Sequence, residues 1–177
     1  MSIHIYHPNK NNSGFASSFS QGKDGTIFAT IIKQSGWDAE KGVGTFKDSK
    51  NDPTKNVSIK LDQVEVAAVL DCLDRGRPFS TVHDGNKGGN TGGSMKSIKF
   101  EPWMKKISQE SIDAGEKPTQ LGYSFSITST DKQDSTKKTS LFIGLNFPEG
   151  RLVREYLMFT LQKSFAWDVQ VETNEAV

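Results

Sequence analysis

The 177-residue sequence contains few of the features that mark secreted or membrane proteins. Cys72 is the only cysteine, which excludes an intramolecular disulfide and a zinc site made of cysteines. No apolar run approaches the length of a transmembrane helix, and residues 1–10 contain no apolar segment of a signal peptide. We therefore expect an intracellular protein without a membrane anchor, and its compartment stays open.

An excess of charge of either sign is also missing. The net charge is +1, from 22 basic and 21 acidic residues, whereas many nucleic-acid-binding proteins are strongly basic. The charge is nevertheless unevenly distributed, because residues 41–60 and 85–107 carry five lysines each against two and one acidic residues. Residues 168–177 carry acidic residues and no basic one. We expect basic loops and an acidic C-terminal tail.

Catalytic motifs are absent as well. The sequence has no Gly-x-Ser-x-Gly, dinucleotide-binding or zinc-hydrolase motif. Its glycine-rich stretch 85–94 lacks the ending of a phosphate-binding loop, and it is interpreted either as a hairpin tip that closes over a ligand or as a solvated linker. His4 and His7 would face opposite sides of a strand, so they do not converge on one metal ion. We expect a protein that is not an enzyme and holds no metal ion or cofactor.

What the sequence does contain is an internal repeat. The segment Ile59–Glu65 (Ile-Lys-Leu-Asp-Gln-Val-Glu) is matched 84 positions later by Ile143–Glu149 (Ile-Gly-Leu-Asn-Phe-Pro-Glu). Each copy predicts the end of a strand, an Asx N-cap and a glutamate that reaches back to the cap. Apolar residues at helical spacing follow each cap, and Gly76 ends the first helix. The second helix is apolar enough to cover a sheet or to form a subunit contact.

Upstream of each predicted helix the apolar period changes to two, which is typical of half-buried strands. Alternating runs at 14–20, 26–32, 94–100, 123–128 and 140–145 are separated by turn signals. The predicted fold class is α+β, with two tandem units of about four antiparallel strands and one helix (ββββα-ββββα). We expect one domain at 1–167, made of repeats at 3–76 and 79–165, and the acidic tail at 168–177.

Alternation also predicts which side chains are buried, since one face of such a strand packs on the core and the other stays wet. The residues expected in the core are Val57, Ile59 and Leu61. Ile27, Ala29 and Ile31 are expected on one face of their strand, and Phe28, Thr30 and Ile32 on the other. An exposed sheet face that mixes Phe, Thr, Ser and Lys is unusual for a purely structural protein.

A strand-rich unit that ends in Ile-x-Leu-Asx-x-x-Glu and a helix, used twice, resembles the Whirly and positive-cofactor-four superfamily. In the first repeat the resemblance covers residues 29–37, 44–47 and 57–61 and the helix. The lysine-rich signature of plant Whirly proteins is absent, which favours a divergent relative, such as one from a phage. The resemblance implies a homo-oligomer that binds single-stranded DNA across its sheets with little sequence preference.

Single-strand binding requires positive charge for the phosphates and flat side chains on which bases stack. The basic segments of this sequence carry interleaved aromatic residues, as in Lys99-Phe100 before Trp103. We therefore predict that lysines grip phosphate and rings stack on bases, although either tryptophan could instead anchor a hairpin on the core. The predicted contacts are Lys33, Trp37, Phe46, Lys47, Lys60, Lys99, Trp103 and Lys105.

Three hypotheses of function remain open on the sequence. The first is non-catalytic binding of single-stranded DNA in replication, recombination or transcription, with the acidic tail either contacting replication proteins or simply frayed. The second keeps the fold but substitutes single-stranded RNA, since stacking serves both. The third is a structural protein that oligomerises through its second helix and uses the sheet for protein contacts. Steep weakening of binding by salt would count against the third.

Overall fold

The computed structural model describes residues 1–23, 25–85 and 93–175, and of residues 166–175 it describes the backbone alone. It contains two four-stranded antiparallel sheets, each followed by a long helix. The predicted α+β class and the tandem ββββα arrangement are confirmed. The first repeat contains β1 (Ser2–His7), β2 (Phe15–Gln21), β3 (Ile27–Lys33), β6 (Asn56–Leu61) and α1 (Gln63–Arg75). The second contains β7 (Phe79–Asp84), β8 (Ser94–Met104), β9 (Gln120–Asp131), β10 (Lys138–Leu145) and α3 (Phe147–Glu175).

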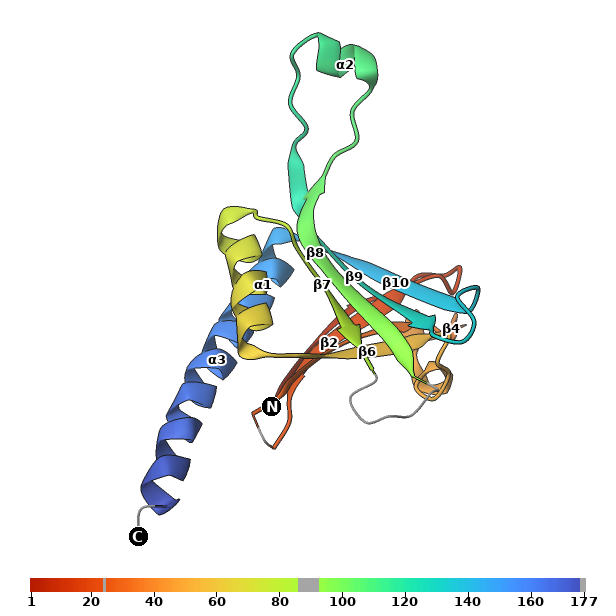
Figure 1. Cartoon of the computed structure of the whole chain (residues 1–177). Helices are drawn as coiled ribbons and strands as arrows, with labels where there is room; N and C mark the ends of the chain where they lie inside the picture. The colour runs from red at the N-terminus through yellow and green to blue at the C-terminus, as the bar shows by residue number, and fades with distance from the viewer. Residues whose placement is uncertain (24, 86–92, 176–177) are drawn as a thin grey trace.

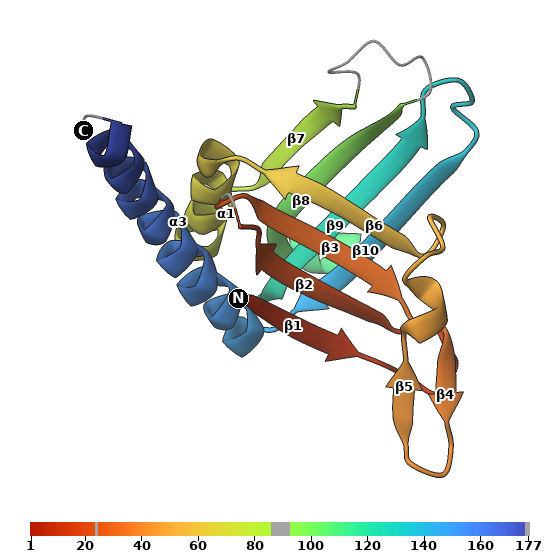
Figure 2. The same cartoon turned by 90° about the horizontal axis from the view of Figure 1, so that it is seen from below.

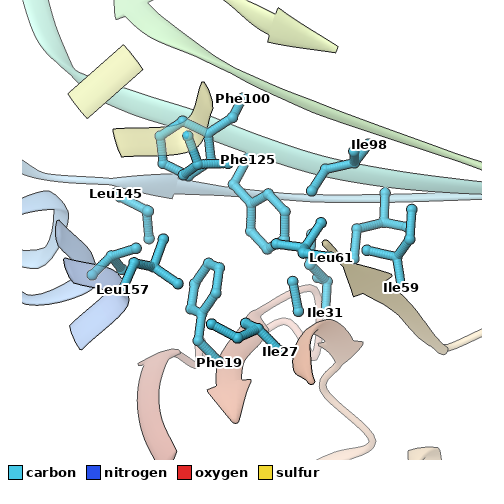
Figure 3. Close-up of a cluster of buried hydrophobic side chains, with 14 of the residues drawn as sticks. Phe19, Ile27, Ile31, Ile59, Leu61, Ile98, Phe100, Phe125, Leu145 and Leu157 are labelled. Atoms are coloured by element: carbon cyan, nitrogen blue, oxygen red, sulfur yellow. The ribbon is translucent and has the colours of Figure 1, made fainter. Parts of the chain in front are cut away.

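The inner faces of the two sheets pack against each other and form the core. The strands of the two sheets cross steeply, and α1 and α3 lie together at one end of the pair (Figure 1, Figure 2). Phe19 of the first sheet meets Phe125 of the second, with ring centroids 5.3 Å apart, and Phe125 also contacts Phe100. Figure 3 shows these rings among the aliphatic side chains of both repeats. Two sheets with one apolar face each are therefore closed against each other.

The predicted burial of the first sheet is confirmed. The side chains that alternate inward are at most 4% exposed, and they are Ile27, Ala29, Ile31, Val57, Ile59 and Leu61. Their neighbours point to the opposite face, where Phe28 is 38% exposed. The register places Phe28 beside Lys60 and Thr30 beside Ser58. This alternation is what creates a polar and partly aromatic outer surface.

Both predicted helix caps are present. The Asp62 carboxylate accepts a hydrogen bond from the backbone N–H of Glu65, and the Glu65 side chain accepts one from the N–H of Asp62. Asn146 and Glu149 exchange the same pair of bonds at 2.9 Å each. Gly76 ends α1 in the left-handed region at φ 68°. The repeated heptapeptide is therefore a strand end joined to a capping box.

The structure adds elements that the sequence did not predict. A small hairpin, β4 (Gly36–Asp38) and β5 (Val43–Thr45), and a short 3₁₀ turn at Lys47–Ser49 stand between β3 and β6. Strands β8 and β9 extend beyond the predicted runs into a long arm that carries α2 (Gln109–Asp113) away from the body (Figure 1). Helix α3 continues to Glu175, into the segment predicted as an acidic tail. Most of the predicted glycine-rich loop, residues 86–92, lies outside the described residues.

Candidate nucleic-acid interface

The outer faces of the two sheets are left open, because the helices close one end of the sheet pair rather than covering it (Figure 1, Figure 2). Hydroxyl groups are frequent there, and some bond to each other within a sheet. Thr30 donates to Ser58 at 2.9 Å on the first sheet. Thr128 and Ser140 share a hydrogen bond of 2.9 Å on the second. The outer faces therefore offer hydrogen-bonding groups on a regular, preformed surface.

The first outer face carries an aromatic side chain near each end. At one end Phe28 pairs with Lys60, which is exposed and extends from the edge strand β6. At the other end Tyr6 is 57% exposed and its ring centroid lies 5.7 Å from that of Phe46. His4 also stacks on Tyr6, with ring centroids 6.1 Å apart. Rings and a lysine thus lie on one face of one sheet.

The second outer face has a comparable combination. Lys99 on β8 pairs with Ser126, which in turn pairs with the 59% exposed Phe142 on the edge strand β10. Trp103 is 46% exposed and its ring lies so close to Gly144 that a Cβ on Gly144 would be 2.8 Å from it. Gly144 therefore provides the space that holds this ring against the sheet.

The chain is similar in structure to solved proteins across nearly its whole length. WHY3 from Arabidopsis thaliana matches with a TM-score of 0.63 at 14% identity, covering 99% of this chain and 95% of that one. The plant transcriptional regulator PBF-2 matches at 0.60 and 14%, covering 98% and 86%. The trypanosome MRP1/MRP2 structure matches at 0.59 and 13%, covering 94% and 87%.

The chain has the Whirly fold. No protein-family model and no curated protein matches it in sequence. The likeness therefore resides in the arrangement of strands and helices, which the repeated strand–cap–helix segment indicated.

On the Whirly fold the eight predicted contact residues separate into two groups. Lys99 and Trp103 lie on the outer face of the second sheet, and Lys105 follows β8 into the arm. The other five belong to the first repeat and are Lys33, Trp37, Phe46, Lys47 and Lys60. Of these, Lys60 lies on the outer face of the first sheet. Phe46 packs against the ring of Tyr6, which lies on the same outer face. Lys33 is the last residue of β3, and the alternation of side chains along this strand places it on the inner side of the sheet.

Some candidates on these faces were missed by sequence reasoning. Tyr6, His4 and Phe142 were not proposed as contacts, although each alternates with buried residues of its own strand. The signal for Tyr6 is its place between Ile5 and His7 in the first strand, which is too short to stand out by periodicity alone. Lys99, which is predicted as a phosphate contact, forms a 2.8 Å salt bridge with Glu101. Its charge is thus partly compensated.

The described residues can also be searched for a metal cluster and a reactive thiol. Within them no group of three His, Cys, Asp or Glu side chains could hold a metal ion. Cys72 is fully buried, its Sγ donates to the carbonyl of Phe100, and burial raises the pKa of its thiol to about 11. The thiol is therefore protonated at neutral pH and is a poor nucleophile. None of the helices in the described part combines the length and apolar character needed to cross a membrane.

Proposed function

We propose that this chain binds single-stranded DNA with little sequence preference, along the outer faces of its two sheets. The observation that supports this most directly is that each open face combines exposed rings with lysine. Phe28 and Lys60 are cross-strand neighbours on the first sheet. Phe142 and Lys99 flank Ser126 on the second.

Stacking supplies most of the affinity in this proposal. A base on an aromatic ring contributes about 1–3 kcal/mol, so two or three rings outweigh a near-neutral total charge. The lysines and the sheet hydroxyls contact phosphate oxygens, which carry no sequence information. Neither kind of contact distinguishes one base from another, and this is why little sequence preference is expected.

The biological process and the assembly belong to the same proposal. One structural neighbour is a plant transcriptional regulator, which supports a role in transcription, replication or recombination rather than in catalysis. Exposed apolar side chains on α3, Leu152, Phe159 and Phe165, support assembly into a homo-oligomer through this helix. The acidic residues near the end of α3 remain candidate contacts for replication proteins.

The test is fluorescence anisotropy of a labelled oligothymidine at two salt concentrations, with duplex DNA and the matching RNA strand as competitors. We expect tight binding that weakens with salt, because bound lysines release counterions from the phosphates. Phe28→Ala should weaken binding on the order of ten-fold. Val64→Ala, which removes a 77% exposed side chain from α1, is the matched control and should have no effect. Absence of binding at low salt would contradict the proposal, and stronger competition by RNA would replace DNA with RNA.

A further inference from the structure

A cavity of about 200 Å³ lies where the first sheet meets the beginning of α1 and the later part of α3. Its walls are apolar and come from both repeats, namely Ile27, Leu61, Val66 and Leu161. Its remaining lining is polar or glycine, namely Gly25, Thr26, Lys60, Asp62, Gln63 and Ser164. An apolar hollow with a few polar groups at its rim is the usual form of a small-ligand site.

The internal repeat shows what fits at this place. Leu61 and Leu145 are equivalent positions of the two repeated heptapeptides. Ile27 pairs with Leu61 in the first sheet, and Tyr123 pairs with Leu145 in the second. Ile27 and Tyr123 therefore occupy the same position in the two repeats, and the second repeat has an aromatic ring where the first has a smaller side chain.

The ring of Tyr123 packs between its sheet and the start of α3, beside an open hollow of about 630 Å³ that Tyr123, Phe147 and Gly150 help to line. A Cβ on Gly150 would lie 2.6 Å from this ring, so the ring lies directly against the helix backbone. Its hydroxyl donates to the carbonyl of Leu73 at 2.8 Å, and Phe147 contacts it edge-on at 6.1 Å. The first repeat has Val66 at the position of Gly150, again 84 residues earlier, and its cavity is lined there by Ile27 and Val66 with no aromatic ring.

The surroundings of the cavity are basic. Lys60 is part of its rim, and an adjoining hollow of about 280 Å³, which shares Gly25 and Ser164, is lined by Lys23 and Lys163. In the described part of the chain none of these three lysines forms a salt bridge. The acidic residue in the lining, Asp62, is engaged as the N-cap of α1. A ligand that combines a planar ring with negative charge is complementary to this arrangement.

We infer that the cavity accepts one base of the bound single strand, with the flanking phosphates on Lys60, Lys23 and Lys163. The inference rests on the proposed function, and it adds a binding position that lies off the sheet faces. A tyrosine flanked by acidic residues of a protein partner resembles a base and its phosphates, because it also combines a planar ring with negative charge. The position of the cavity favours the base, because Lys60 belongs both to the rim and to the Phe28–Lys60 pair on the first outer face. One strand can therefore run from the sheet face into the cavity.

The first test uses methyl NMR of the whole chain. Oligothymidine, thymidine 5′-monophosphate and an Asp-Tyr-Asp peptide are titrated separately, and the methyl signals of Leu61, Val66 and Leu161 are followed. Shifts with both nucleotide probes, larger than with the peptide, are the expected result. Shifts with the peptide alone would overturn the inference in favour of a protein ligand.

The second test fills the cavity. Ser164→Phe places a ring at its rim, and Gln162→Phe adds the same ring on another side of α3, outside the lining. Ser164→Phe should weaken oligothymidine binding on the order of ten-fold and remove the methyl shifts. Gln162→Phe should bind as the unaltered chain does. If Ser164→Phe does not fold, the NMR titration of the unaltered chain decides alone.

Failure of the inference is distinguishable from failure of the proposed function. Oligothymidine binding without shifts at the three methyl-bearing residues would overturn the cavity site and leave sheet-face binding intact. Absence of oligothymidine binding would contradict the proposed function and with it the base site on a bound strand. Shifts with the monophosphate in that case would identify a mononucleotide site instead, which also overturns the inference as stated.

Discussion

His83 Nε2 lies 2.5 Å from Glu65 Oε1, and this contact joins the first strand of the second repeat to the helix cap of the first. The opposite connection is also present, because His7 Nε2 lies 2.7 Å from Glu149 Oε1. In both glutamates the second carboxylate oxygen accepts the backbone N–H of the cap residue. Each capping glutamate therefore holds its own helix and the other repeat at once.

Removing one histidine should destabilise the whole chain. His83→Ala leaves the carboxylate of Glu65, whose residue is only 8% exposed, without this partner. Loss of a partner to a buried charged group costs about 1–3 kcal/mol or more. The measurement is the free energy of unfolding in urea, with exposed His4→Ala as the control. An equal effect of the two substitutions would show that the contact with Glu65 adds nothing to stability.

The contact between Trp103 and Gly144 can be tested by a double-mutant cycle. Gly144→Val should displace the ring of Trp103, because even a Cβ would lie 2.8 Å from it. Gly144→Val and Trp103→Ala should each weaken oligothymidine binding several-fold, and together no more than Trp103→Ala alone. Additive losses in anisotropy titrations would mean that Gly144 acts independently of the ring.

The thiol of Cys72 should make stability fall at alkaline pH. Burial raises its pKa from 9.0 to about 11, so between these values the unfolded chain loses a proton that the folded chain keeps. Stability contributed by this group is therefore complete below pH 9 and is lost as pH rises toward 11. Urea midpoints at pH 8 and pH 10 measure the fall, and Cys72→Ala should reduce it. Burial also raises the pKa values of Tyr123 and Tyr156 above their ordinary value of 10.0, so from about pH 10 these two groups lower stability in the same direction.

The close packing of Tyr123 against α3 gives a prediction about stability. Gly150→Ala places a methyl group 2.6 Å from the ring and should cost about 1–3 kcal/mol in the free energy of unfolding. Tyr123→Leu removes the ring, and in that background Gly150→Ala should cost less. Thermal unfolding of the four proteins measures the coupling. An unchanged cost without the ring would place the strain elsewhere.

The repeat and its local signals predicted the core of the fold. Asp62 with Glu65, and Asn146 with Glu149, specify their caps within a few residues, and strand alternation follows from burial of one face. The β4–β5 hairpin was not predicted, because its strands are three residues long and alternate no buried side chains. The arm was not predicted because β8 beyond Phe100 and the start of β9 are stabilised by pairing with each other, which local sequence does not encode.

The candidate site was harder to predict for a related reason. Lysine and aromatic residues were recognisable, but their grouping depends on which strands are neighbours. Tyr6 and Phe46 are 40 positions apart in the sequence and meet only because the β4–β5 segment returns to the first strand. The salt bridge of Lys99 with Glu101, both on one strand face, could have been foreseen from their spacing of two. The DNA-binding roles of the eight residues stay predictions.

The two histidine–glutamate contacts have the form of an isologous interface within one chain. His7 and His83 hold the same position in their sheets. In the first sheet His7 pairs with Phe15, which pairs with Lys33. In the second sheet His83 pairs with Lys96, which pairs with Ser129. In a twofold dimer, residue i of one subunit touches j of the other and the reverse contact is identical. The chain thus has the contact pattern of a fused homodimer. Separate polypeptides 1–76 and 77–177 should therefore combine into one folded complex. In either half alone, the capping glutamate lacks the histidine that the other half provides.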